Sequence, residues 1–246
     1  MSKAKPKQKR HNGHYSLSPT PSTFNLLDII PLTTNQRKTF GAFHNGKNLF
    51  LHGVAGSGKT FISIYLSLKE IEKGHYDKII IYRSTVPSRD MGFMPGNSKE
   101  KTRVYEAPYY SIFSKLYNRG DAYDILKRTG AVDFESTAFV RGITIENAIV
   151  IVDEMQNMSA QELNSLITRV GDNCKVIFCG DIRQTDLDKR RETTGLCDFY
   201  KIIESMSSFE LVEFVVDDIV RSKLVKEYIL TRMKLEDNGA IKTLHV

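Results

Sequence analysis

Residues 53–60 read Gly-Val-Ala-Gly-Ser-Gly-Lys-Thr, and this short pattern constrains the fold more than any other part of the chain. Residues 48–52 before it have the composition of a strand, and residues 59–73 after it repeat apolar side chains at helical spacing. A glycine-rich loop between a strand and a helix directs backbone N–H groups and the positive end of the helix dipole at phosphate. The sequence therefore predicts a phosphate-binding loop (P-loop) within an α/β fold.

The side chains of this loop have separate predicted roles. Lys59 is expected to reach the β- and γ-phosphates of ATP, and the hydroxyl of Thr60 is expected to ligate Mg²⁺. A loop that binds nucleotide without hydrolysing it remains the alternative. The residues expected to hold the nucleotide are Gly53, Val54, Ala55, Gly56, Ser57, Gly58, Lys59 and Thr60.

An acidic pair follows a run of aliphatic residues at 148–152. A continuous aliphatic run is typical of a strand buried on both faces. Asp153 is expected to hold Mg²⁺ through a water molecule, and Glu154 is placed to polarise the water that attacks the nucleotide. Gln156 and Gln184, which follow this strand and the next, are interpreted as contacts to the γ-phosphate. An ordinary loop residue is the alternative for Gln184.

Strand-like and helix-like segments alternate along the chain. This order predicts a P-loop NTPase fold with a central, mostly parallel sheet and helices on both faces. Strands are predicted at 48–52, 78–82, 148–152, 175–179 and 209–215. Helices are predicted at about 33–44, 59–73, 108–117, 121–128 and 159–170, after residue 195, and from about residue 220.

The positive charge is concentrated at the N-terminus. The net charge is +6, and the first ten residues carry five lysines or arginines and no acidic residue, which leaves +1 for the other 236. Residues 1–23 are interpreted as a basic disordered tail and residues 24–246 as the ATPase domain. The tail is either solvated chain or an arm that binds nucleic-acid phosphates, and one segment can be both.

Composition also limits the setting in which the protein works. No apolar stretch approaches the roughly 20 residues that a membrane-spanning helix needs, and no apolar segment follows the basic N-terminus. Cys174, Cys179 and Cys197 show no CxxC or Cys/His spacing. We therefore expect a cytoplasmic protein without a disulfide or zinc site.

These motifs resemble superfamily-one helicase motor domains, and most of all the PhoH-like family, over about residues 33–230. The resemblance implies ATP hydrolysis, a ring of identical subunits with a hexamer favoured, and association with RNA or single-stranded DNA. Small phage proteins of this family are similar in being little more than the ATPase domain. Besides the P-loop, the resemblance rests on residues 92–96 with 100–101, 139–144, 152–157, 166–171, 180–187 and 219–225.

The resemblance also implies roles for residues outside the P-loop. Gln36 resembles the glutamine that reads the edge of the adenine base. Arg169 and Arg221 resemble candidates for the arginine that neutralises γ-phosphate charge, either within one subunit or from a neighbouring one, with a structural salt bridge as the alternative for each. The chain departs from the family pattern at Ile143, Met155 and Ser222, where the family usually has arginine, alanine and histidine.

Candidate nucleic-acid contacts follow the second predicted strand. Arg83 and Arg89 are expected to hold backbone phosphates. Tyr105, Tyr109 and Tyr110 are interpreted either as stacking partners of bases or as side chains that pack the core or a subunit contact. Two other functions stay open: an ATP-dependent protein-remodelling or signalling module, and a nucleotide-holding structural protein with negligible turnover.

Overall fold

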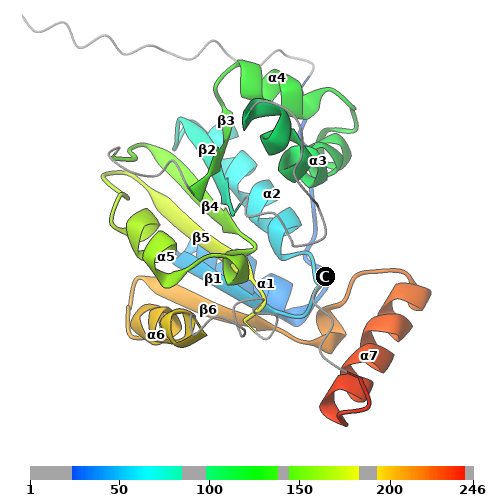
Figure 1. The fold of residues 1–246 in the computed structure, drawn as a ribbon. Coiled ribbons are helices and arrows are strands. Elements are labelled where there is room, and N and C mark those ends of the chain that lie inside the picture. Colours follow the sequence, from blue (N-terminus) through cyan, green and yellow to red (C-terminus); the bar gives the residue numbers. More distant parts are fainter. Residues whose placement is uncertain (1–23, 85–97, 138–143, 183–192, 242–246) are drawn as a thin grey trace, which may run out of the picture.

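The computed structural model describes residues 24–84, 98–137, 144–182 and 193–241. In these ranges a single six-stranded sheet runs in the order β3-β2-β4-β5-β1-β6, and every pair of neighbouring strands is parallel (Figure 1). The predicted parallel sheet is therefore confirmed. The strands are β1 (Asn48–Gly53), β2 (Lys78–Arg83), β3 (Val132–Ser136), β4 (Ala148–Asp153), β5 (Lys175–Gly180) and β6 (Phe209–Phe214).

Helices cover both faces of the sheet, as predicted. Two separate groups of buried apolar side chains lie on the two faces, one under α1 to α4 and the other under α5 and α6. The helices on the first face are α1 (Thr34–His44), α2 (Lys59–Glu72), α3 (Ser98–Tyr117) and α4 (Ala122–Arg128). Those on the second face are α5 (Ala160–Ile167) and α6 (Thr193–Glu204).

Local sequence signals explain where several helices begin. The Ser159 hydroxyl accepts from the Glu162 backbone N–H, while the Glu162 carboxylate accepts from the Ser159 N–H. This is the capping box that the sequence predicts at the start of α5. Thr33 caps α1 through its side chain in a similar way. The residue before α2 is Gly58, which has a left-handed conformation and no side chain that could cap the helix. The first backbone N–H groups of α2 therefore have no side-chain cap.

Two elements differ from the sequence prediction. Strand β3 is absent from that prediction, because its alternation of apolar and polar side chains covers only five residues at the edge of the sheet. Helix α3 begins at Ser98, ten residues before the predicted start at Pro108, which lies inside the helix. The first turns of α3 are mostly charged and polar, so they carry no apolar repeat by which a helix could be recognised.

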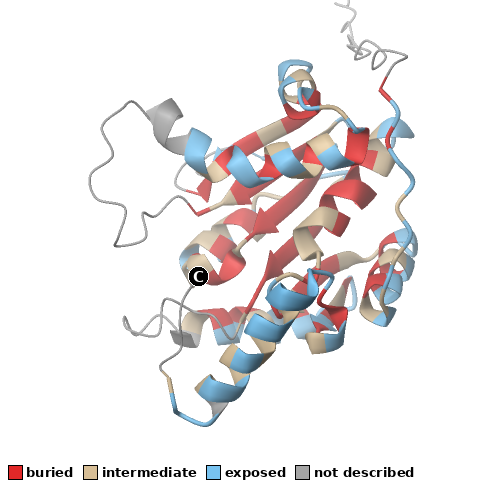
Figure 2. Ribbon diagram, turned by 90° about the vertical axis from the view of Figure 1, so that its right-hand side faces the viewer, coloured by how far each residue is buried: buried red, intermediate tan, exposed pale blue. Residues whose placement is uncertain are grey.

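Helix α7 (Lys223–Asp237) projects from the edge of the sheet (Figure 1). Figure 2 shows none of its residues of described burial as buried, although its sequence includes Leu224, Tyr228 and Leu235, which are among the exposed large apolar side chains. In the described ranges, none of the helices is both long enough and apolar enough to cross a membrane.

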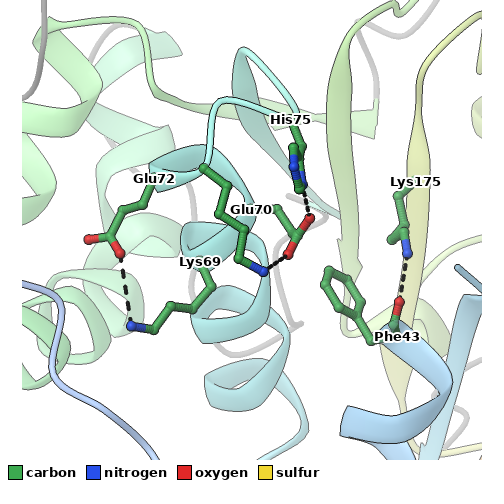
Figure 3. A network of polar contacts seen from close by, with 7 residues as sticks. Phe43, Lys69, Glu70, Glu72, His75 and Lys175 are labelled. Atoms are coloured by element: carbon green, nitrogen blue, oxygen red, sulfur yellow. Dashed lines mark hydrogen bonds and ion pairs between the residues drawn. The ribbon is translucent and has the colours of Figure 1, made fainter. Parts of the chain in front are cut away.

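Polar contacts gather at the amino-terminal end of the sheet (Figure 3). Lys175, the first residue of β5, donates to the Phe43 carbonyl oxygen at 2.9 Å, near the end of α1, and lies 4.2 Å from the centre of the Phe43 ring. Burial lowers the pKa of Lys175. On α2, the Glu70 carboxylate accepts from Lys73 and contacts His75, each at 2.7 Å. These contacts lie at the end of the sheet opposite the P-loop.

A Glu70→Gln variant is expected to lose about 0.5–1 kcal/mol of stability at pH 7, because it breaks the contacts with Lys73 and His75. The loss is small because these two partners are largely exposed and water screens their charges. Partial burial acts to raise the pKa of Glu70, but hydrogen bonds from Lys73 and His75 outweigh it and lower the pKa. The stabilisation is therefore complete above the unfolded-state pKa and is lost as the pH falls through the folded-state pKa. Urea unfolding from pH 7 to below the folded-state pKa of Glu70 should show the difference shrinking in the acidic part of the range. Glu72→Gln, which breaks only a 4.0 Å ion pair, is the control.

Candidate active site

The P-loop follows β1 at the carboxyl edge of the sheet, where β1 lies between β5 and β6. Gly53, Gly56 and Gly58 all have positive φ angles, of 115°, 78° and 87°. A Cβ atom at Gly53 would overlap the carbonyl oxygen of Phe214 on β6, which also accepts from the Val54 N–H at 3.0 Å. The motif thus occupies the strand-to-helix context that phosphate binding requires, and its glycines are needed for backbone geometry.

Lys59 lies folded against the loop that precedes it. Its Nζ donates to the carbonyl oxygens of Gly53 and Val54, both at 2.8 Å. Burial lowers the pKa of Lys59, and nearby acidic side chains, Asp181 first among them, oppose that effect. This partly buried ammonium group and the N-terminus of α2 are together positioned to bind an anion.

Asp153, the last residue of β4, faces the start of α2. It is only 4% exposed, and its two carboxylate oxygens have different partners. The Thr60 hydroxyl donates to Oδ1 at 2.7 Å, and the Tyr109 hydroxyl donates to Oδ2 at 2.8 Å. A hydroxyl and a carboxylate in contact are oxygen ligands of the kind that Mg²⁺ prefers, so these residues fit the predicted metal site.

Glu154 continues from Asp153 in a left-handed backbone conformation with a φ of 52°. Such a conformation is strained for a residue other than glycine and is concentrated at functional sites. Burial, followed by the charge of Asp153, raises the pKa of Glu154. The Glu154 carboxylate therefore lies close enough to that of Asp153 to be affected by its charge.

Gln156 joins the ends of β4 and β5. It lies in the short 3-10 helix η2 (Met155–Asn157), donates to the Glu154 carboxylate at 2.5 Å, and accepts from the Asp181 N–H at 3.0 Å. The structure therefore brings Gln156 and Asp181 together at the ends of two neighbouring strands. Gln184 lies outside the described residues.

Gln36 is buried beside the P-loop. Its side-chain oxygen accepts from the Leu32 N–H at 2.7 Å, and its amide nitrogen donates to the Ser57 carbonyl oxygen at 3.1 Å. The start of α1 is further held by Asn35, which donates at 2.7 Å to Asp218 in the short 3-10 helix η4 (Val216–Asp218). Gln36 thus lies at the P-loop end of the sheet and connects α1 to the loop.

The structure separates the two candidate arginines. Arg221 follows η4, and its side chain lies over Gly56, where a Cβ atom would come within 2.9 Å of the Arg221 Cγ. The segment is anchored by the Val220 N–H, which donates to the Gly56 carbonyl oxygen. Arg169 follows α5 at the amino-terminal edge of the sheet, where its carbonyl oxygen accepts from the Ile145 N–H. Arg221 therefore lies at the P-loop of its own chain and Arg169 does not.

The tyrosines of α3 fit packing better than base stacking. Tyr109 is fully buried and Tyr110 packs against Tyr123, with 4.6 Å between ring centres. Tyr105 is partly buried against the same core. The contact of Tyr109 with Asp153 could not be found by sequence reasoning, since the two residues are 44 positions apart and no motif joins them. Arg89, Ile143 and the basic tail lie outside the described residues.

Comparison with known proteins identifies one family. The PhoH family, described as PhoH-like protein, matches residues 28–232. A PhoH-like protein of Bacillus subtilis (strain 168) is 31% identical over 198 residues, which are 80% of this chain and 61% of that protein. Protein PhoH of Escherichia coli (strain K12) is 35% identical over 185 residues, 74% of this chain and 52% of that protein. The chain thus spans between about half and three fifths of these relatives.

A search of solved structures finds more distant similarity. The large terminase from a thermophilic bacteriophage is 14% identical and superposes with a TM-score of 0.48. The match covers 83% of this chain and 50% of the terminase chain. Unliganded Pif1 from Bacteroides sp is 16% identical, covers 87% of this chain with 47% of its own, and has a TM-score of 0.39.

Proposed function

Because this chain belongs to the PhoH-like family, we propose that it is a Mg²⁺-dependent ATPase that couples hydrolysis to binding or remodelling RNA or single-stranded DNA, as a ring of identical subunits. The observation that carries the hydrolytic part is the contact between Thr60 and Asp153, with Glu154 beside them and Lys59 in the same loop. A P-loop and a paired acidic strand end are the two halves of a site for phosphoryl transfer to water.

In this proposal each residue has a defined task. Lys59 and the N–H groups of the loop bind phosphate oxygens. The Gln36 amide accepts once, from Leu32, and donates once, to Ser57, so one N–H and one oxygen lone pair remain to contact the adenine edge. Thr60 and Asp153 hold Mg²⁺, which when bound neutralises charge on the phosphates. Glu154, oriented by Gln156, polarises the attacking water and accepts its proton.

The arginines would act on the γ-phosphate from different chains. Arg221 lies over the P-loop of its own chain, which supports a role within one subunit. Arg169 lies at the opposite end of its own sheet, so a role for it in hydrolysis requires a neighbouring subunit. A guanidinium group supplied across a subunit contact would make hydrolysis depend on assembly. We retain Gln184 as a proposed γ-phosphate contact on the strength of the family resemblance.

The nucleic-acid part of the proposal is supported by the family resemblance and by the five positive charges among the first ten residues. We expect single-stranded RNA or DNA to stimulate ATP hydrolysis several-fold at low salt, with the stimulation fading as salt is raised, because phosphate contacts release counterions. The measurement is steady-state ATPase activity with and without each oligonucleotide. Changing Lys3, Lys5, Lys7, Lys9 and Arg10 to glutamine should reduce the stimulation.

The outcomes separate the parts of the proposal. Hydrolysis that no oligonucleotide affects would contradict the nucleic-acid role and favour a protein-remodelling module. Negligible turnover at every condition would contradict the ATPase itself. Light scattering in the presence of ATP and Mg²⁺ tests the ring, and we expect a mass of six chains of 28.0 kDa. A monomer under all these conditions would contradict the ring.

A further inference from the structure

The Asp153 carboxylate accepts from two hydroxyl groups, one at each of its oxygens. Thr60, on α2, donates to Oδ1, and Tyr109, on α3, donates to Oδ2. Thr60 is part of the nucleotide loop, whereas Tyr109 belongs to a helix that otherwise packs against the core on the same face of the sheet. Tyr109 is fully buried, so its hydroxyl has no access to solvent as an alternative partner.

The direction of the Tyr109 hydrogen bond follows from its partner. An ionised carboxylate can only accept, so the Tyr109 hydroxyl donates its single proton to Asp153. Arg83 is the last residue of β2 and is paired in register with Asp153 on β4. Its positive charge acts on Tyr109 and opposes the rise that burial causes in the pKa of that hydroxyl.

We propose that Tyr109 is a positioning residue, which holds Asp153 in the orientation that pairs it with Thr60 at the proposed Mg²⁺ site. This inference rests on the proposed function. A carboxylate at the end of a strand can rotate about two side-chain bonds, and the Thr60 contact fixes only one of its oxygens. The second contact removes that freedom before the metal ion binds. Hydrogen bonds of this outer kind commonly change metal affinity by about one or two orders of magnitude.

The test is a Tyr109→Phe variant, which removes only the hydroxyl. We expect the Mg²⁺ concentration that half-saturates nucleotide binding to rise roughly tenfold. Binding of a fluorescent ADP analogue is measured as Mg²⁺ is added, and again with the metal chelated, where wild type and variant should agree. The same shift should appear in the Mg²⁺ dependence of ATP hydrolysis, with a much smaller change in rate at saturating Mg²⁺.

Tyr123→Phe is the matched control. Tyr123 is also fully buried on the same face, and its hydroxyl donates to a carboxylate, that of Glu106, at 3.1 Å, without contacting the site. We expect its Mg²⁺ dependence to equal that of the wild type, with a similar change in thermal stability in both variants. An unchanged half-saturating concentration in Tyr109→Phe would overturn the inference. An equal shift in both variants would also overturn it, since the effect would then be a general loosening of the fold.

The binding measurement keeps this inference separate from the ATPase proposal. If the wild type binds nucleotide in a Mg²⁺-dependent way but does not hydrolyse ATP, the proposed function fails while a roughly tenfold shift in Tyr109→Phe still supports the role of Tyr109. If the wild type hydrolyses ATP and the variant has the same Mg²⁺ dependence, the proposed function stands and the role of Tyr109 fails.

Discussion

A Glu154→Gln variant is expected to bind ATP almost as well as the wild type and to hydrolyse it at least about a hundredfold more slowly. The substitution keeps the shape of the side chain and its contact with Gln156 but removes the carboxylate that accepts a proton from water. Loss of a general base of this kind typically costs about two to four orders of magnitude in rate. Single-turnover hydrolysis and equilibrium binding of ATP measure the two effects separately.

Two other variants sharpen the result. Lys59→Ala should weaken nucleotide binding as well as hydrolysis, because it removes the ammonium group at the phosphate end of the loop. Glu146→Gln makes the same chemical change at an exposed position near the opposite edge of the sheet and should leave both properties unchanged. Hydrolysis by Glu154→Gln within a few-fold of the wild-type rate would contradict the role of this carboxylate.

Most of the sheet could be predicted because its strands have a strong local signal. The aliphatic run before Asp153 and the glycine-rich motif after β1 each define a strand and the side chains at its end. Since the carboxyl ends of parallel strands lie at one edge, the convergence of Thr60, Asp153 and Glu154 follows from the order of elements. The signal for β3 is weaker, because apolar and polar side chains alternate over only five residues, and its position at the edge comes from pairing with β2.

The rest of the site depends on contacts between distant parts of the chain. The sequence leaves Tyr109 as a base-stacking or packing residue, and only the docking of α3 brings its hydroxyl to Asp153. Arg83, expected from sequence to hold nucleic-acid phosphates, is paired in register with Asp153 at the end of the sheet where the P-loop begins. The two arginines assigned one role by resemblance lie at opposite edges of the sheet. Spacing along a sequence cannot give such distances.

A Gly53→Ala variant is expected to lose more than about 3 kcal/mol of stability together with nucleotide binding. Gly53 has a φ of 115°, which an alanine adopts only with strain of roughly 1–3 kcal/mol. In addition, the new methyl group would overlap the backbone of Phe214 on the neighbouring strand β6. Backbone atoms cannot rotate aside as a side chain can, so β1 and β6 would have to separate where they are paired in register.

The control for Gly53→Ala separates strain from overlap. Gly46 also has a positive φ, of 81°, but a Cβ atom there would meet nothing within 4 Å. Gly46→Ala should therefore cost only about 1–2 kcal/mol, the conformational part of the effect. Urea unfolding of the two variants gives the difference. Since the Phe214 carbonyl oxygen also accepts from the Val54 N–H, separating the strands would shift the start of the P-loop. Equal losses of stability in Gly46→Ala and Gly53→Ala would contradict the prediction, because the overlap with β6 would then add nothing to the conformational strain.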